Sequence, residues 1–255
     1  MTSPTAQTSP QVYARSAGVL YLIITVAAIV AHFYVPSQLI VSGNAEATAT
    51  NIMASESLFR IGGIGSELIT LLSEIVLSVL IYVLFKPVSK TLSLVAVVSR
   101  LAMTTIHGIN LLNLFLVWLL LSGADYLTVF KADQLHALAT LFLEAHRYGF
   151  AIGIAFFTLH VFVLGYLIIK SGYFPRILGI LFLIAAFAYL IDSSATLLFA
   201  NSNYKTPDLL AMLIAVAEIA FPLWLLIKGV RVAQWEKLAL YQPDRAGAER
   251  IGSAI

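Results

Sequence analysis

Seven ionisable side chains lie deep inside apolar stretches of this chain: Glu67, Glu74, Arg100, His107, His160, Asp192 and Glu218. An Asp, Lys or Arg at the centre of a membrane span costs about 2.5–3.5 kcal/mol, so such groups face the interior of a helix bundle and find partners there. A carboxylate beside a neutral imidazole in that setting can relay a proton or hold a cation. Together with Asn110, the seven residues form a candidate binding layer. The sequence indicates no catalytic residue, no metal ligand and no cofactor.

The spacing around Pro87 predicts which of these residues meet. Glu74 and Arg100 each lie 13 residues from Pro87, and Glu67 and His107 each lie 20 residues from it. Two antiparallel helices joined by a tight turn place such residues at equal depth, and residues seven apart share one helix face. We therefore expect two rungs, Glu74 with Arg100 and Glu67 with His107.

Three further residues are expected at these depths. His160 and Glu218 each lie ten residues before a basic residue that ends a span. This places them at the depth of the Glu74–Arg100 rung, the inner of the two, about 15 Å from the cytoplasmic span ends. Asp192 is expected at the depth of the Glu67–His107 rung, the outer of the two. Buried polar contacts also hold helices in register, at about 0.6–2 kcal/mol each. Each residue is thus either a strut or part of a site, and the Glu74–Arg100 pair most favours the structural role.

The elements that must position this layer are membrane spans. Of 255 residues, 60% are hydrophobic and only 11% are charged, against about a quarter charged in soluble domains. Six stretches reach the length of about 20 residues that a bilayer crossing needs. They are Ala17 to Val35, Leu58 to Phe85, Thr91 to Leu121, Tyr148 to Ile169, Ile177 to Ala200 and Leu209 to Ile227. We predict an all-α integral membrane protein, a bundle of six transmembrane helices.

Basic residues predict the orientation and the domain limits. With the N-terminus in the cytoplasm, ten of the fifteen Lys and Arg residues fall on the cytoplasmic side, which favours both termini inside. Short extracytoplasmic helices are expected in the first loop, at 44–54, and in the third, at 133–146, where an amphipathic segment can lie along the interface. Residues 1–13 read as a disordered polar tail, 14–230 as one six-span domain, and 231–255 as a basic cytoplasmic tail whose Trp235 rests on the membrane surface.

Three stretches of the sequence resemble those of a known protein family. Ala14-Arg-Ser-Ala-Gly18, Ser57-Leu-Phe-Arg-Ile-Gly62 and the run from Phe156 to Ser193 carry the likeness. On these the chain resembles an uncharacterised bacterial membrane family, domain of unknown function 4386. The resemblance implies a multi-pass protein of the bacterial cytoplasmic (inner) membrane and implies no activity.

Three functions remain open at this point. The chain has no cysteine, no Gly-rich phosphate loop, no H-E-x-x-H and no G-x-S-x-G, and its net charge of +2 suggests no nucleic-acid partner. A non-enzymatic membrane component that senses, assembles or binds a lipid or small molecule fits best. A proton- or ion-coupled transporter of small solutes is the alternative, and an intramembrane metal-dependent hydrolase ranks third. The partners expected are the lipid bilayer and a lipid or small-molecule ligand, and the sequence does not set an oligomeric state.

Overall fold

The computed structural model describes residues 9–199 and 205–240, and all its regular elements in these ranges are helices. In chain order they are α1 (Pro10–Ile29), the π-helix η1 (Val30–Tyr34), α2 (Val35–Leu39), α3 (Ala45–Ala54), the π-helix η2 (Leu58–Gly65), α4 (Ser66–Phe85), α5 (Lys90–Leu120), the 3₁₀ turn η3 (Asp125–Leu127), α6 (Ala132–Ser171), α7 (Arg176–Leu198) and α8 (Asp208–Ile227). Six helical runs are long and apolar enough to cross a membrane: Pro10–Leu39, Leu58–Phe85, Lys90–Leu120, Ala132–Ser171, Arg176–Leu198 and Asp208–Ile227. The predicted all-α bundle with six spans is confirmed.

Local capping explains where the long helices begin and end. The Ser9 hydroxyl accepts from the Gln11 amide at 3.3 Å, with Pro10 in the first helical position. The Ser89 hydroxyl caps α5 in the same way, which satisfies an amide that a helix start would leave free. At the C-terminal end of α6, Gly172 adopts φ +69°. This left-handed conformation ends a helix with little strain only at glycine. Short turns follow, so α4 with α5 and α6 with α7 are antiparallel neighbours.

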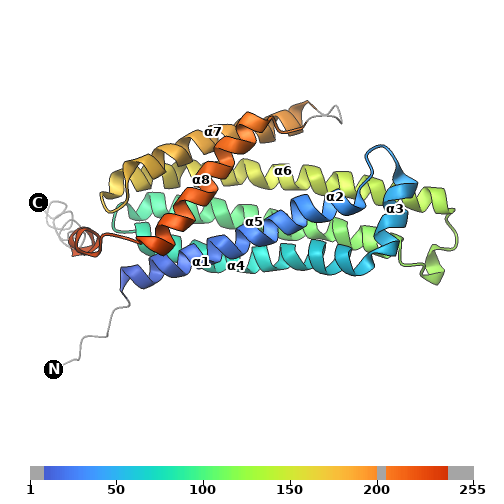
Figure 1. Cartoon of the computed structure of the whole chain (residues 1–255), viewed down its shortest axis with the longest axis horizontal. Helices are drawn as coiled ribbons and strands as arrows, with labels where there is room; N and C mark the ends of the chain where they lie inside the picture. The colour runs from blue at the N-terminus through green and yellow to red at the C-terminus, as the bar shows by residue number, and fades with distance from the viewer. Residues whose placement is uncertain (1–8, 200–204, 241–255) are drawn as a thin grey trace, which may run out of the picture.

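Both ends of the described chain lie at one end of the bundle, here termed the terminal end, and α3 lies at the opposite, distal end (Figure 1). Helices α5, α6 and α7 pack in succession, while α1 packs against α4 and α8. Helix α8 crosses α1 near the terminal end, and α7 and α8 then diverge from α1 and α2 toward the distal end (Figure 1). The helices are thus splayed further apart toward the distal end (Figure 1).

Small residues and lipid-facing side chains account for the packing. A Cβ built on Gly165 of α6 would lie 2.9 Å from the Gly179 carbonyl oxygen of α7, so glycine lets these two helices approach backbone to backbone, as membrane helices commonly do. Large apolar side chains point outward, among them Leu72, Ile109 and Phe187, which are 66%, 65% and 59% exposed. So many exposed large apolar side chains suit contact with lipid rather than water.

The helices predicted in the two long loops have different outcomes. Helix α3 forms in the first loop, and the Asn44 side chain caps it through the Ala47 amide at 2.9 Å. The separate helix predicted at 133–146 is wrong, because α6 runs unbroken for 40 residues from Ala132 to Ser171. The α6 sequence from Ala132 to Ser171 contains no proline and only three isolated glycines, Gly149, Gly153 and Gly165. One such glycine costs a helix about 1 kcal/mol, which is too little to end it.

The structure describes part of each predicted tail. Helix α1 begins at Pro10, inside the segment predicted as a polar tail, and residues 1–8 lie outside the described ranges. Residues 232–240 are helical. There Trp235 docks on the bundle, because its Nε1 donates to the Leu84 carbonyl at 2.9 Å. Tyr173 donates to the same carbonyl at 2.7 Å, and burial raises the pKa of its hydroxyl, which keeps it a donor.

Candidate functional site

Two clusters of polar side chains occupy the interior at different depths. The arginine cluster consists of Tyr21, Glu74, Arg100 and His160 and lies toward the terminal end. The histidine cluster consists of His32, Glu67 and His146 and lies in the distal half. The two clusters differ in exposure and in how fully their polar atoms are paired, which separates their roles.

The arginine cluster joins four helices through the side chain of Arg100 on α5. Its Nε and Nη2 atoms donate to the two carboxylate oxygens of Glu74 on α4, with an Nη2–Oε1 distance of 2.9 Å. Its Nη1 donates to the Tyr21 hydroxyl of α1 at 3.2 Å and contacts His160 Nε2 of α6 at 2.9 Å. The rings of Tyr21 and Phe157 flank the guanidinium at 5.0 and 5.3 Å. One cation thus ties α1, α4, α5 and α6 together.

The hydrogen bonds of His160 fix its tautomer. Its Nδ1 lies 2.8 Å from the Ala96 carbonyl oxygen, which can only accept, so Nδ1 carries the proton. Nε2 then accepts from Arg100, whose guanidinium is always charged and only donates. His160 is therefore neutral, and Arg100 and His160 are only 1% and 0% exposed. Four of the five N–H donors of Arg100 thus point at protein acceptors, and this pairing favours a structural role for the arginine cluster.

Glu218 stands at the edge of this cluster. It was predicted at the same depth as Glu74 and His160, and it lies on α8, half-buried. Its Oε1 accepts a long hydrogen bond of 3.4 Å from the Tyr189 hydroxyl of α7. Asp192, predicted with the outer rung, lies half-buried on α7 outside both clusters. Neither acid belongs to the two groups of side chains that meet in the interior.

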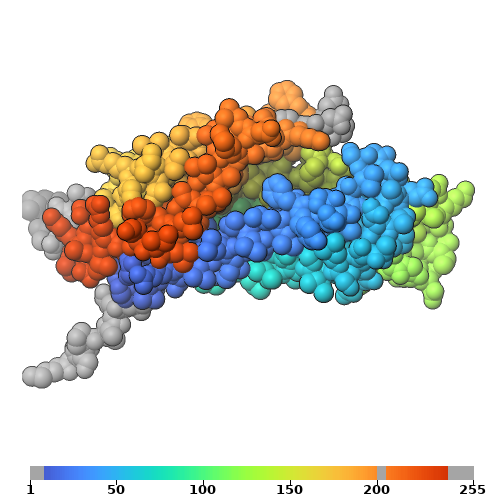
Figure 2. Space-filling model, viewed as in Figure 1, coloured from blue at the N-terminus to red at the C-terminus, as the bar shows by residue number. Residues whose placement is uncertain are grey.

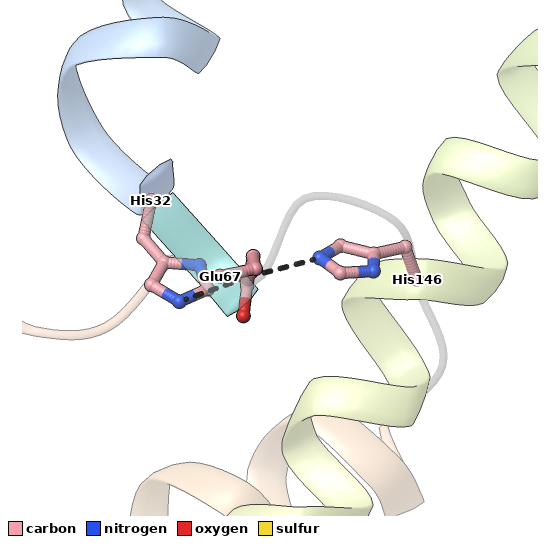
Figure 3. Close-up of side chains that lie close together, drawn as sticks. All are labelled: His32, Glu67 and His146. Carbon is pink, nitrogen blue, oxygen red and sulfur yellow. Dashed lines mark ion pairs between the residues drawn. The ribbon is translucent and has the colours of Figure 1, made fainter. Parts of the chain in front are cut away.

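In the histidine cluster, one carboxylate faces two imidazoles from different helices (Figure 3). Glu67 Oε1 lies 3.2 Å from His32 Nε2 and 3.7 Å from His146 Nε2. Glu67 is 4% exposed, and this Oε1 accepts no hydrogen bond of regular geometry from the described residues. The side chains of the two histidines are 23% and 16% exposed. A carboxylate oxygen and two imidazole nitrogens can share a proton or ligate a metal ion.

Two of the three residues of the histidine cluster lie in or next to π-helices. His32 lies within η1, and Glu67 follows η2 by two residues. π-Helical turns are rare and occur frequently at functional sites, because the extra residue in the turn redirects the side chains around it. The glycines of η2 let it come close to α2, since a Cβ on Gly62 would lie 2.9 Å from Val35 Cγ2.

Helix α5 supports the cluster from behind through two polar residues. The Phe150 ring of α6 lies between the His32 ring, at 4.4 Å, and the His107 ring, at 4.7 Å. His107 Nε2 donates to the Phe150 carbonyl at 3.1 Å. Asn110 Nδ2 donates to the His146 backbone carbonyl at 2.9 Å and lies 3.1 Å from His146 Nδ1, which is 3.4 Å from the Asn110 backbone carbonyl. His107 and Asn110 therefore orient the two cluster histidines.

A cavity of about 630 Å³ adjoins the histidine cluster. Residues of η1, α2, α3 and α6 line it, including both cluster histidines and apolar side chains such as Val35, Ile52 and Phe150. Its volume falls within the range of 300–1,000 Å³ that is usual for small-molecule sites. Figure 2 shows a hollow between α8 and the run of α1 and α2, with α6 at its back.

The predicted layer is thus split. The Glu74–Arg100 rung forms as predicted, and His160 joins it. The Glu67–His107 rung does not form. Glu67 meets His32 and His146 instead, because α1 packs beside α4 and His107 reaches across to α6.

Sequence reasoning missed His32 and His146. His32 lies inside the first predicted span, so the rule that selected the other buried ionisable residues also applied to it. His146 was placed in a surface helix, and only the continuity of α6 brings it to the depth of Glu67.

Comparison with known proteins gives the family. A family model described as domain of unknown function (DUF4386) matches residues 16–229, which cover both clusters and all six spans except the first turns of α1. The chain belongs to this family. It is similar to an uncharacterised protein of the archaeon Archaeoglobus fulgidus, 29% identical over 171 residues, which are 67% of this chain and 85% of that protein. The likeness is therefore not confined to bacteria. No solved structure matches the chain.

Proposed function

We propose that this DUF4386 protein is a non-enzymatic membrane component that binds a lipid-like or small apolar ligand in its distal cavity. The observation that carries the proposal is the cavity itself, which has apolar walls and two half-buried histidines on one side. Ligand sites combine mostly apolar walls with a few convergent polar groups in this way. The ligand would place its apolar part against Val35 and Ile52 and a polar group toward the histidine cluster.

The arrangement of basic residues supports an orientation with the terminal end in the cytoplasm. Lys86, Lys90, Lys170, Arg176 and Lys228 all lie at helix ends or turns of the terminal end. Positive charges concentrate on the cytoplasmic side of membrane proteins. The distal cavity would then open in the outer half of the bacterial cytoplasmic membrane.

Transport is the second candidate, and the sealed arginine cluster weighs against it. A solute passing through the bundle interior at the depth of Glu74 and Arg100 would have to break an ion pair whose members are 4% and 1% exposed. Separating such a pair leaves a buried charge uncompensated, at about 3–5 kcal/mol. Binding needs no such step.

The test is native mass spectrometry of gently extracted protein. We expect a reproducible added mass on the wild type. Thr140→Trp, on the α6 wall of the cavity, should remove it by filling the space. Leu141→Trp is the matched control. Leu141 is the next residue along α6 and is 59% exposed, so this variant should leave the added mass unchanged. An empty wild type, or equal loss in both variants, would contradict the proposal, and substrate-driven flux into proteoliposomes would favour transport.

A further inference from the structure

We infer that His32, Glu67 and His146 bind one divalent transition-metal ion, with Zn²⁺ the first to test. The inference rests on the proposed function, because it places a group at the wall of the same cavity. It goes beyond that function in naming the group that would meet a ligand there.

The spacing of the three donor atoms fits a tetrahedral ion. Two ligands at about 2.0–2.1 Å from a tetrahedral Zn²⁺ lie about 3.3 Å from each other. Glu67 Oε1 lies 3.2 Å from His32 Nε2 and 3.7 Å from His146 Nε2, values on either side of that distance. All three donor atoms lie within 4.8 Å of one another, so small side-chain rotations suffice to close them around one ion.

The two histidine contacts that pair the buried carboxylate of Glu67 lack regular hydrogen-bond geometry. Glu67 is 4% exposed, and its Oε1 accepts no regular hydrogen bond although two imidazoles lie beside it. An unpaired buried charge is strongly unfavourable. A cation coordinated by Glu67 and the two histidines would pair the charge and explain why His32 and His146 approach the same oxygen (Figure 3).

The surroundings of the histidines match those of metal ligands. A ligating histidine commonly donates its other ring N–H to a carbonyl or carboxylate, which fixes the ring. The backbone carbonyl of Asn110, 3.4 Å from His146 Nδ1, would be that acceptor once a metal ion occupies Nε2, although the shorter contact of this Nδ1, at 3.1 Å, is to the donor Asn110 Nδ2. Asn110 Nδ2 also donates to the His146 backbone carbonyl at 2.9 Å. The His32 ring contacts Phe150, whose ring also stacks with His107. Both histidines would thus bind through Nε2.

The fourth coordination position would face the cavity. His32 and His146 line it, and Glu67 lies behind them. Two histidines and one carboxylate leave an open position in many metal sites, where water or a ligand atom binds. We therefore expect the ligand of the cavity to carry an oxygen donor, such as a phosphate or carboxylate, beside its apolar part.

The experiment measures metal directly on protein purified without chelators and without a polyhistidine tag. After dialysis against Zn²⁺ and removal of the excess, elemental analysis should give about one ion per wild-type chain. Glu67→Gln, His32→Gln and His146→Gln should each weaken Zn²⁺ binding by more than about 100-fold, since even loss of a supporting residue costs 10–100-fold. His136→Gln is the matched control, because it removes another imidazole of α6 outside the cluster.

Substitution with Co²⁺ covers the case in which a variant fails to fold. The wild type should then show the intense visible bands of tetrahedral Co²⁺. A weak spectrum like that of the hydrated ion, the absence of stoichiometric Zn²⁺, or an equal effect of His136→Gln would overturn the inference. Metal bound in a cavity that takes up no ligand would contradict only the proposed function. A ligand bound by protein that takes up no Zn²⁺ would contradict only the metal site.

Discussion

At the scale of single residues, Arg100 shows how the fold accommodates a permanent charge. A guanidinium has five N–H donors, and four of those of Arg100 reach Glu74, Tyr21 and His160. These contacts come from three other helices, so the charge is paired only when the whole bundle is assembled. Arg100 is therefore a sensitive reporter of folding.

Removing that side chain should be strongly destabilising. Arg100→Ala leaves Glu74 buried without its partner, and we expect a loss of about 3–5 kcal/mol of unfolding free energy. The double variant Glu74→Leu with Arg100→Leu removes both charges and should lose much less. Thermal unfolding in detergent compares them. Equal melting of the single and double variants would show that the pair does not stabilise the bundle.

The same residues show what the sequence could and could not predict at the site. Glu74 and Arg100 meet because they lie on one hairpin, where counting residues from Pro87 gives their depth. Glu67 meets His32 and His146, which lie on helices distant in sequence. Their meeting depends on which helices pack together, and hydrophobic periodicity gives no information on that order.

At the scale of elements, glycines of α6 make room for the polar residues of α5. A Cβ added to Gly153 would overlap the His107 ring, and one added to Gly149 would overlap the Asn110 side chain. The two helices can thus approach closely with large polar groups between them. The spans and the α4–α5 turn were predictable from composition and from Pro87, but the two π-helices were not, because an apolar helical pattern does not distinguish an i→i+5 turn from an i→i+4 turn.

Substituting one of these glycines should loosen the pair of helices. Gly153→Ala forces His107 away from Phe150 and should cost about 1–3 kcal/mol, as overpacking does elsewhere. Gly108→Ala is the control on α5, because its Cβ would meet Leu71 Cδ1 at an ordinary 3.9 Å. We expect it to be neutral or mildly stabilising. Chemical unfolding monitored by circular dichroism would measure both, and equal losses would contradict the steric argument.

At the scale of the whole molecule, the chain's lack of cysteine makes its proposed orientation easy to test. Ser42→Cys places a thiol in the exposed distal loop, and Glu236→Cys places one in the exposed helix 232–240 at the terminal end. A membrane-impermeant thiol reagent should label the first in intact cells and the second only after permeabilisation. The reverse pattern would put the termini outside and the distal cavity on the cytoplasmic side.

The pairing of Glu74 with Arg100 also determines how the protein responds to the membrane voltage. A full charge that crosses a potential of 100 mV changes its energy by about 2.3 kcal/mol. Because Glu74 and Arg100 carry opposite charges on adjacent atoms, the voltage exerts almost no net force on them. The Glu74–Arg100 pair therefore contributes almost nothing to a voltage response. An Arg100→Ala variant would carry a lone carboxylate at the same depth, and its stability would then depend on the membrane potential in which it is measured.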